Sequence, residues 1–177
     1  EWQFEAVHSI LIASFGTYRE STISVQQQRI APKFPAVENL TIVPPPPLAP
    51  QCFQQMDLVW TDGQYPCTAS EKPDFSGWMR FNPERHDNRK MTVADLMVAF
   101  DMWPPGVLPM FKTFAPASSL TWHVTYVHPL HSHLQDWFKY KVFTDYAAEG
   151  YSTEYAHLWD AENRLIAISR QTVTVFA

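Results

Sequence analysis

The sequence is poor in the features that mark several large classes of protein. Its two cysteines, Cys52 and Cys67, are too few among 177 residues for a disulfide framework, so both are predicted to be free thiols. The 13 lysines and arginines are scattered rather than gathered into a basic patch, which argues against nucleic acid as a partner. No apolar run approaches the roughly 18–20 residues that a membrane-spanning helix needs, and no secretory signal is visible. We therefore expect an intracellular protein without a membrane span, in a compartment that the sequence does not name.

What the sequence does contain is a large apolar and aromatic fraction. Hydrophobic residues make up 46% and aromatic residues 15%, which is typical of a globular protein with one full core. Proline is concentrated in residues 32–76, where fixed φ angles and missing N–H donors disfavour helices and interior strands. This segment is predicted to be a linker with one short helix near Gln51–Leu58. Before it, residues 1–31 are predicted to form two strands, Trp2–Ile12 and Tyr18–Ile30.

Residues 77–177 carry the pattern of a compact α+β domain. After a short strand at Gly77–Phe81, the apolar residues that follow Thr92 recur with helical spacing, and the two prolines after Trp103 require the helix to end there. A single helix followed by an antiparallel meander predicts the hotdog fold, in which a sheet wraps around a central helix. The strands predicted after the helix are Ser119–Val127, Trp137–Ala147, Tyr151–Asp160 and Leu165–Phe176.

Three polar residues of this domain stand in apolar stretches. Asp101 ends the predicted helix, Ser119 begins the next strand, and Gln171 lies in the last strand. Taken singly, each has an ordinary structural explanation as a helix end or a strand position that faces solvent. Together, a carboxylate, a hydroxyl and an amide can hold and polarise one water molecule. The trio therefore suggests hydrolysis of an ester or a thioester.

A short internal match links the two ends of the chain. Residues 23–26 read Ile-Ser-Val-Gln and residues 168–171 read Ile-Ser-Arg-Gln, and both close an apolar strand pattern. The separation leaves room for one intervening domain and a linker. Because the chain begins at Glu1, we expect its front to be incomplete. The expected organisation is the terminal strands of an incomplete first hotdog at 1–31, the linker at 32–76 and a second hotdog at 77–177.

On these residues the chain resembles the bacterial type-II acyl-CoA thioesterases and the related double-hotdog proteins. Asp101 and Ser119 match the family's helix-ending Asp and the Thr or Ser that begins the next strand. The family's Trp-containing first strand is similar to Trp78–Arg80, and its Leu-Val/Ile-Ala-x-x-x-Gln pattern is similar to Leu165–Gln171. Two departures are Ser119 in place of the commoner Thr, and Val-His-Pro at 127–129 in place of His-Arg-Pro. The resemblance implies a double hotdog of which this chain holds the C-terminal unit.

The resemblance also implies a reaction and its residues. An acyl-CoA or another acyl thioester would be the substrate, with Asp101 as the general base and with Ser119 and Gln171 orienting the attacking water. Trp103 and Gly106, in the turn after Asp101, are candidate substrate-binding residues, although core or interface packing explains Trp103 equally well. The chemistry requires no metal and no cofactor. A homo-oligomer, or pairing with the missing part of the first hotdog, is the expected assembly.

Other interpretations were weighed against this one. A hotdog hydratase or dehydratase would pair an Asp with a His five residues later, and no Asp of this chain has such a partner. A non-catalytic hotdog subunit that serves as a scaffold is the alternative function, because the Pro-rich linker and the many aromatic residues suit it. Retention of the polar trio argues against a scaffold. Metal binding is disfavoured because no carboxylate or cysteine at zinc-site spacing accompanies His123, His128, His131 and His133.

Overall fold

The computed structural model describes residues 9–25, 30–42, 44–45 and 49–176. Within them the chain forms one antiparallel sheet, one α-helix and three short 3-10 helices. No helix in this part of the chain is long and apolar enough to cross a membrane. In chain order the elements are η1 (Val37–Asn39), η2 (Gln51–Gln55), β1 (Met56–Gly63), β2 (Phe75–Phe81), α1 (Val93–Asp101), η3 (Leu108–Met110), β3 (Ala117–Tyr126), β4 (Phe138–Ala148), β5 (Tyr151–Trp159) and β6 (Leu165–Val175).

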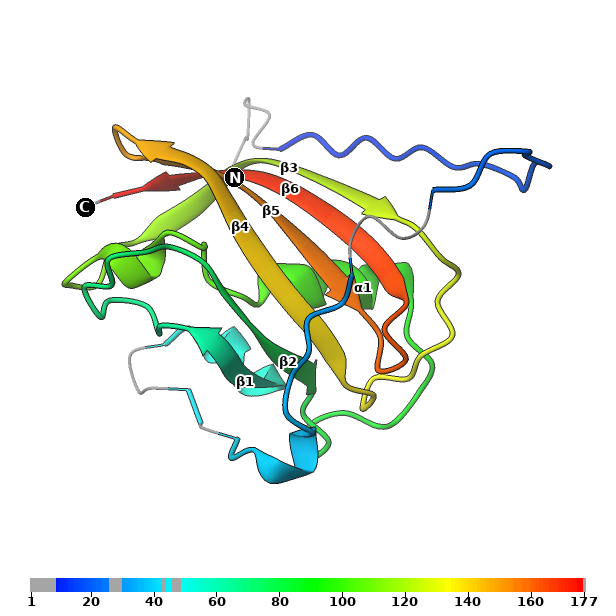
Figure 1. Cartoon of the computed structure of the whole chain (residues 1–177), viewed down its shortest axis with the longest axis horizontal. Coiled ribbons are helices and arrows are strands. Elements are labelled where there is room, and N and C mark those ends of the chain that lie inside the picture. Colours follow the sequence, from blue (N-terminus) through cyan, green and yellow to red (C-terminus); the bar gives the residue numbers. More distant parts are fainter. Residues whose placement is uncertain (1–8, 26–29, 43, 46–48, 177) are drawn as a thin grey trace, which may run out of the picture.

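The sheet curves around the helix. Its strand order is β1-β2-β4-β5-β6-β3, and every neighbouring pair is antiparallel. Helix α1 lies against the concave face of the sheet (Figure 1), where Leu96, Ala99 and Phe100 are buried. This is the hotdog fold that the sequence predicted. The predicted helix is also confirmed, because Thr92 is its N-cap and Asp101 its last residue.

The predicted meander is wrong for its first strand. β3 pairs with β6 at the far edge of the sheet rather than with β4, so the chain crosses the end of the sheet between Tyr126 and Phe138. β4 is buried at Phe138, Tyr140 and Val142, whereas β3 is exposed along most of its length. A strand with exposed faces suits an edge, and an apolar strand suits the centre of a sheet. Burial therefore decides the strand order here, and proximity in the sequence does not.

The segment predicted as a linker contains the first strand of the sheet. A proline-free stretch of it, Met56–Gly63, forms β1 and pairs with β2. Met56 and Leu58 from this strand are buried in the core. The short helix predicted here is the 3-10 helix η2, which ends directly before β1. The prolines around this stretch led to the prediction of a linker, but the sheet begins at Met56 rather than near residue 77, where the sequence predicted its first strand.

The two strands predicted near the amino end differ from what the structure contains. Residues 9–25 and 30–31 form no strand, and the rest of the stretches Trp2–Ile12 and Tyr18–Ile30 lies outside the described residues, as does Gln26 of the internal match. A lone extended segment has no neighbouring strand with which to form a ladder, and nothing to pack its side chains against. Its apolar side chains are accordingly exposed at Ile10, Leu11, Ile12, Phe15, Tyr18 and Ile23.

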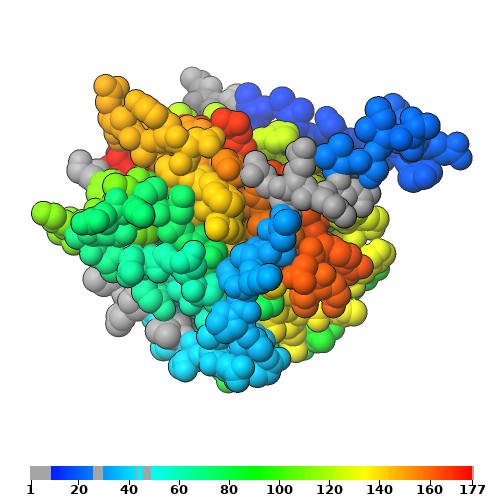
Figure 2. Space-filling model, viewed as in Figure 1, coloured from blue at the N-terminus to red at the C-terminus, as the bar shows by residue number. Residues whose placement is uncertain are grey.

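Residues 32–35 attach this segment to the convex face of the sheet. The Nζ of Lys139 donates a hydrogen bond to the carbonyl of Pro32 at 3.1 Å. The indole N–H of Trp78 donates to the carbonyl of Pro35, also at 3.1 Å, and the Phe34 ring meets the same indole edge-on. Figure 2 shows the chain following residue 30 lying across the molecule, beside the turn between β5 and β6. The attachment therefore uses the backbone carbonyl groups of two prolines as hydrogen-bond acceptors.

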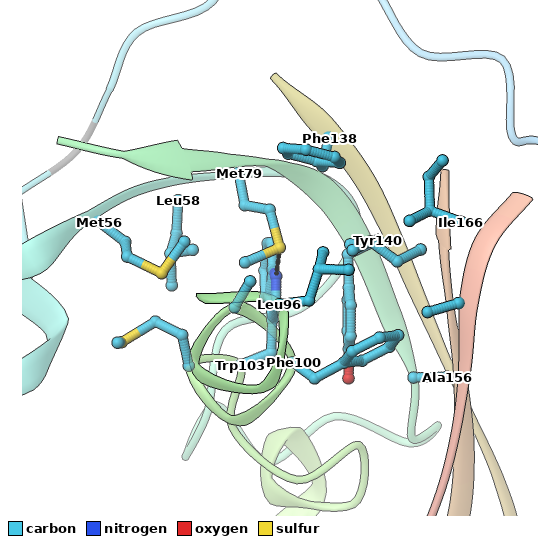
Figure 3. Packing of buried hydrophobic residues seen from close by; sticks show 14 of the residues in the cluster. Met56, Leu58, Met79, Leu96, Phe100, Trp103, Phe138, Tyr140, Ala156 and Ile166 are labelled. Carbon is cyan, nitrogen blue, oxygen red and sulfur yellow. Dashed lines mark hydrogen bonds between the residues drawn. The ribbon is translucent and has the colours of Figure 1, made fainter. Parts of the chain in front are cut away.

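The main core fills the space between α1 and the concave face (Figure 3). Trp103, directly after the helix, stacks on Tyr140 with the ring centroids 4.9 Å apart and the planes 5° from parallel. The Trp103 indole N–H also donates to the sulfur of Met79 at 2.9 Å. These contacts hold the end of α1 against β2 and β4. They thereby fix the position at which Asp101 leaves the helix.

Candidate functional site

The concave face of the sheet carries polar side chains between the main core and a smaller apolar cluster that includes Val173 and Val175. On β5 the side chains that face the helix are Leu158 and Ala156, followed by Glu154 and Ser152, and all four are buried. Cross-strand partners in an antiparallel sheet point to the same face, so the neighbouring strands can be followed in the same way. We name the polar side chains in the second half of this face the polar end. Its members are Ser119, Thr144, Ser152, Glu154 and Gln171.

Three of these residues form one row across three strands. Thr144 on β4 is opposite Glu154 on β5, and Glu154 is opposite Gln171 on β6. The Oγ1 of Thr144 and the Oγ of Ser152 are buried and have no hydrogen-bond partner among the described residues. Buried hydroxyl groups are normally paired with protein or with ordered water. The polar end therefore has hydrogen-bonding capacity beyond what its own side chains use.

Ser119 and Gln171 meet across β3 and β6. Ser119 is opposite Val173, which lies on the same face of β6 as Gln171, and the pairing of the two strands shifts register between Ser119 and Thr121, as at a β-bulge. The Nε2 of Gln171 donates a hydrogen bond to the Oγ of Ser119 across the two strands. Ser119 is exposed and Gln171 half-buried, so the pair lies where the polar end opens to solvent.

Asp101 approaches the same region from the end of α1. In the described structure its carboxyl makes no hydrogen bond to Ser119 or Gln171, and loss of surrounding water raises its pKa even though the residue remains exposed. The phenol of Tyr140, wholly buried, has a raised pKa because of burial first, and then because of Glu154 and Asp101. Both carboxyl groups thus lie close enough to Tyr140 to act on it.

Glu154 is a residue of this region that the sequence analysis missed. It is 4% exposed, and its carboxylate accepts the backbone N–H of Gly106 at 2.7 Å. Burial raises the pKa of Glu154 to about 7, with a smaller upward contribution from the nearby Asp74 charge, while the Gly106 hydrogen bond opposes the shift. A signal for it was available, because Glu154 occupies an inward position of the alternating pattern of β5 between Ser152 and Ala156.

The two residues predicted to bind substrate lie in different surroundings. Trp103 is 5% exposed and is packed among the aromatic rings of the core. Gly106 lies against β4 so closely that a Cβ atom would stand 2.9 Å from Thr144 Oγ1 and 3.0 Å from a methyl group of Val142. Gly106 is therefore at the polar end, whereas Trp103 is in the apolar core beside it.

Other features of the surface lie elsewhere. A hollow of about 470 Å³ on the convex side is lined by Trp78, Trp137 and the turn after β5, among other residues, and includes none of the predicted catalytic side chains. Cys52 and Cys67 are free thiols, as predicted. In the part of the chain that the structure describes, no group of three or more His, Cys, Asp or Glu side chains is arranged to hold a metal ion.

Comparison with known proteins gives one family and a set of similar structures. The sequence model of the family described as the acyl-CoA thioesterase C-terminal domain matches residues 31–175. A conserved protein of unknown function with a hotdog fold from Alicyclobacillus acidocaldarius superposes with a TM-score of 0.75 at 19% identity, covering 92% of this chain and 60% of the other. An acyl-CoA thioesterase II of Mycobacterium marinum superposes with a TM-score of 0.64 at 13% identity, covering 88% and 59%. The chain thus spans about 60% of the length of these proteins. No curated protein matches it.

Proposed function

Because this chain belongs to the acyl-CoA thioesterase C-terminal domain family, we propose that it hydrolyses an acyl thioester with a water molecule held at the polar end. In this proposal Asp101 is the general base, and Ser119 and Gln171 orient the water. The acyl group is carried by CoA or by a carrier protein. The observation that carries the proposal is the hydrogen bond between Gln171 and Ser119, which joins two of the three residues across separate strands.

The chemistry needs little more than a positioned water. The water oxygen attacks the thioester carbonyl carbon while the carboxylate of Asp101 accepts one of its protons. The tetrahedral intermediate then collapses, the C–S bond breaks, and the sulfur leaves as a thiolate. The proton held by Asp101 passes to the thiolate or to solvent, which restores the carboxylate. A thiolate is a good leaving group, so no strong acid is required beside the sulfur.

The environment of Asp101 suits a base. Partial removal of water raises its pKa, which makes the carboxylate a stronger proton acceptor than a fully solvated one. Gln171 uses its N–H to bond with Ser119, and this leaves the amide oxygen to accept from water. Ser119 can in turn donate its own proton. The pair therefore offers one donor and one acceptor to the same water.

The proposal extends to the substrate-binding residues and to the assembly of the protein. Gly106 and Trp103 are assigned to substrate binding, with Gly106 nearer the reacting atoms because it lies at the polar end. The chain is assigned as the second unit of a double hotdog, with residues 1–31 contributed to the first unit. Assembly as a homo-oligomer, or by pairing with the remainder of the first hotdog, would cover the exposed edge strand β3.

A non-catalytic role is the second candidate, and one observation favours it. Exposed apolar side chains between residues 10 and 25, such as Ile12 and Phe15, are the kind of surface that binds another protein. A scaffold subunit would use this segment and leave the polar end idle. Measurement of turnover separates the two candidates, since a scaffold hydrolyses no thioester.

The test is hydrolysis of a panel of acyl-CoAs from short to long chain, followed by release of free thiol. Asp101→Asn is measured beside the parent, and Asp87→Asn serves as a matched control because Asp87 is exposed in the loop between β2 and α1. We expect turnover on part of the panel, a loss of about a hundredfold or more in Asp101→Asn, and parent-like activity in the control. Equal turnover in all three proteins would refute the role of Asp101. Absence of turnover in all three would favour the scaffold.

A further inference from the structure

We propose that Glu154 is a positioning residue of the thioesterase site. It holds the loop after Asp101 against β5, the strand that pairs with β6 at Gln171. The inference rests on the proposed function. Glu154 lies directly between the two halves of the site: its cross-strand partner on one side is Gln171, and its hydrogen-bond partner on the helix side is Gly106. The Glu154 carboxylate is the side-chain group that accepts the Gly106 N–H.

The loop that Glu154 holds is short and stiff. Gly106 follows Asp101 by five residues, and two of the intervening residues are Pro104 and Pro105. Proline fixes φ, so a displacement of Gly106 is passed to the end of α1 instead of being absorbed between them. The position of the Asp101 carboxylate therefore depends on where Gly106 is held.

Gly106 is held from two sides. Its N–H is bound by Glu154, and its carbonyl accepts the backbone N–H of Asp74 at 2.9 Å. The absence of a Cβ lets the loop lie against Thr144 and Val142 at distances that a methyl group would not tolerate. The same contact places Gly106 in the row formed by Thr144, Glu154 and Gln171. The hydrogen bond from Gly106 to Glu154 therefore links this loop to β5, and through β5 to Gln171 on β6.

The energetic cost of Glu154 argues that it is not present for stability. A carboxyl group 4% exposed, with one backbone hydrogen bond and no ion pair among the described residues, is disfavoured in its ionised form. The charge of Asp74 acts on Glu154, and Glu154 and Asp101 both act on the Tyr140 phenol, and none of these groups supplies positive charge. A buried carboxyl of this kind is more typical of functional sites than of packing.

The position also makes the loop sensitive to pH. An ionised carboxylate accepts a shorter and stronger hydrogen bond than a neutral carboxyl does. Since burial raises the pKa of Glu154 to about 7, the Gly106 bond strengthens as pH rises through neutrality. The group that positions Asp101 would then add an ascending limb to the pH profile of kcat, separate from the ionisation of Asp101 itself.

Two substitutions distinguish positioning from packing. Glu154→Leu keeps most of the volume but leaves the Gly106 N–H without an acceptor, whereas Glu154→Gln keeps an acceptor but does not titrate. We expect Glu154→Leu to lower kcat about tenfold or more at pH 8 with little change in KM. Glu154→Gln should keep most of the parent's kcat and should remove the ascending limb of its pH profile near pH 7. Glu84→Gln, on an exposed loop, is the matched control, and circular dichroism verifies the fold of each variant.

A second readout does not depend on turnover. The amide resonance of Gly106 should titrate near pH 7 in the parent protein and not in Glu154→Gln. An active parent with unchanged kcat and pH profile in Glu154→Leu would overturn the positioning role alone, as would a Gly106 amide that does not titrate. A parent without thioesterase activity, in which Gly106 still titrates, would instead overturn the proposed function, and with it any role of Glu154 in catalysis.

Discussion

The two ends of the concave face are built on the same strands and differ in what they do. At the apolar end, Leu158 and Val142 are fully buried against the helix, and Trp103 stacks on Tyr140. A few residues further along the same strands, Glu154 is buried without a cation and Thr144 has a buried hydroxyl without a partner. The first end is packed mainly with apolar and aromatic side chains, whereas the second holds buried polar groups that a core normally excludes.

The difference separates stability from function within one sheet. Apolar burial at one end stabilises the fold, and the strands then carry polar groups into a position where they cost stability. Departures of this kind are expected at functional sites and are tolerated because the rest of the fold is well packed. Substitutions at the apolar end should therefore lower the free energy of unfolding at every pH, and those at the polar end should change turnover or the pH dependence of activity and stability.

The largest expected effect belongs to the apolar end. Leu158 is 0% exposed at the centre of the core, so Leu158→Ala removes buried methyl groups and leaves a cavity. We expect a loss of about 2–5 kcal/mol in the free energy of unfolding, measured by urea denaturation. Activity per folded molecule should stay near that of the parent. A large loss of kcat in a stable Leu158→Ala protein would break the division between the two ends.

The next effect concerns the stability cost of Glu154. Its pKa rises from an ordinary value of 4.5 to about 7 on folding, so the unfolded chain loses this proton first as pH increases. The contribution of Glu154 to stability is thus most favourable below pH 4.5, falls as pH rises toward 7, and stays lower above it. Relative to Glu154→Gln, the parent should lose about 2–3 kcal/mol between pH 5 and pH 8. Parallel pH dependences in the two proteins would contradict burial of an ionisable group here.

A smaller effect is expected at the pair that orients the water. Ser119→Ala and Gln171→Ala each remove one partner of the hydrogen bond between β3 and β6, so we expect kcat/KM to fall about tenfold in each. Ser119→Thr keeps the hydroxyl and should retain most activity. Thr125→Ala, on the other face of β3, is the control. Full activity in both alanine variants would remove the pair from the site.

The smallest expected effect concerns Thr92, which lies outside both ends of the concave face. Thr92 caps α1, with its side chain accepting the N–H of Asp95 while Asp95 accepts the N–H of Thr92. Thr92→Ala should lower the free energy of unfolding by about 1 kcal/mol. Turnover by the folded protein should not change, because α1 is held at its other end by Trp103. Loss of turnover without loss of stability would mean that the helix start also positions Asp101.

The helix and most of the strands could be predicted from periodicity, since the apolar residues after Thr92 and along β6 repeat as their elements require. The place of β3 could not, because strand order depends on burial that only the folded sheet reveals. β1 was hidden by the prolines around it. Ser119 and Gln171 could be named from a resemblance, but their hydrogen bond depends on the pairing of β3 with β6, which the sequence did not predict. Glu154 was overlooked because its strand was interpreted only as structure.

The most direct test of the account is a single turnover in ¹⁸O-labelled water. Parent protein in excess over an acyl-CoA substrate is allowed one cycle, and the acid product and the protein are then examined by mass spectrometry. If Asp101 activates a water molecule as a general base, the first acid released carries one ¹⁸O atom and the protein carries none. If the product is unlabelled and the label is found in the protein, the carboxylate attacked the thioester itself, and the account of the polar end as a water site is wrong.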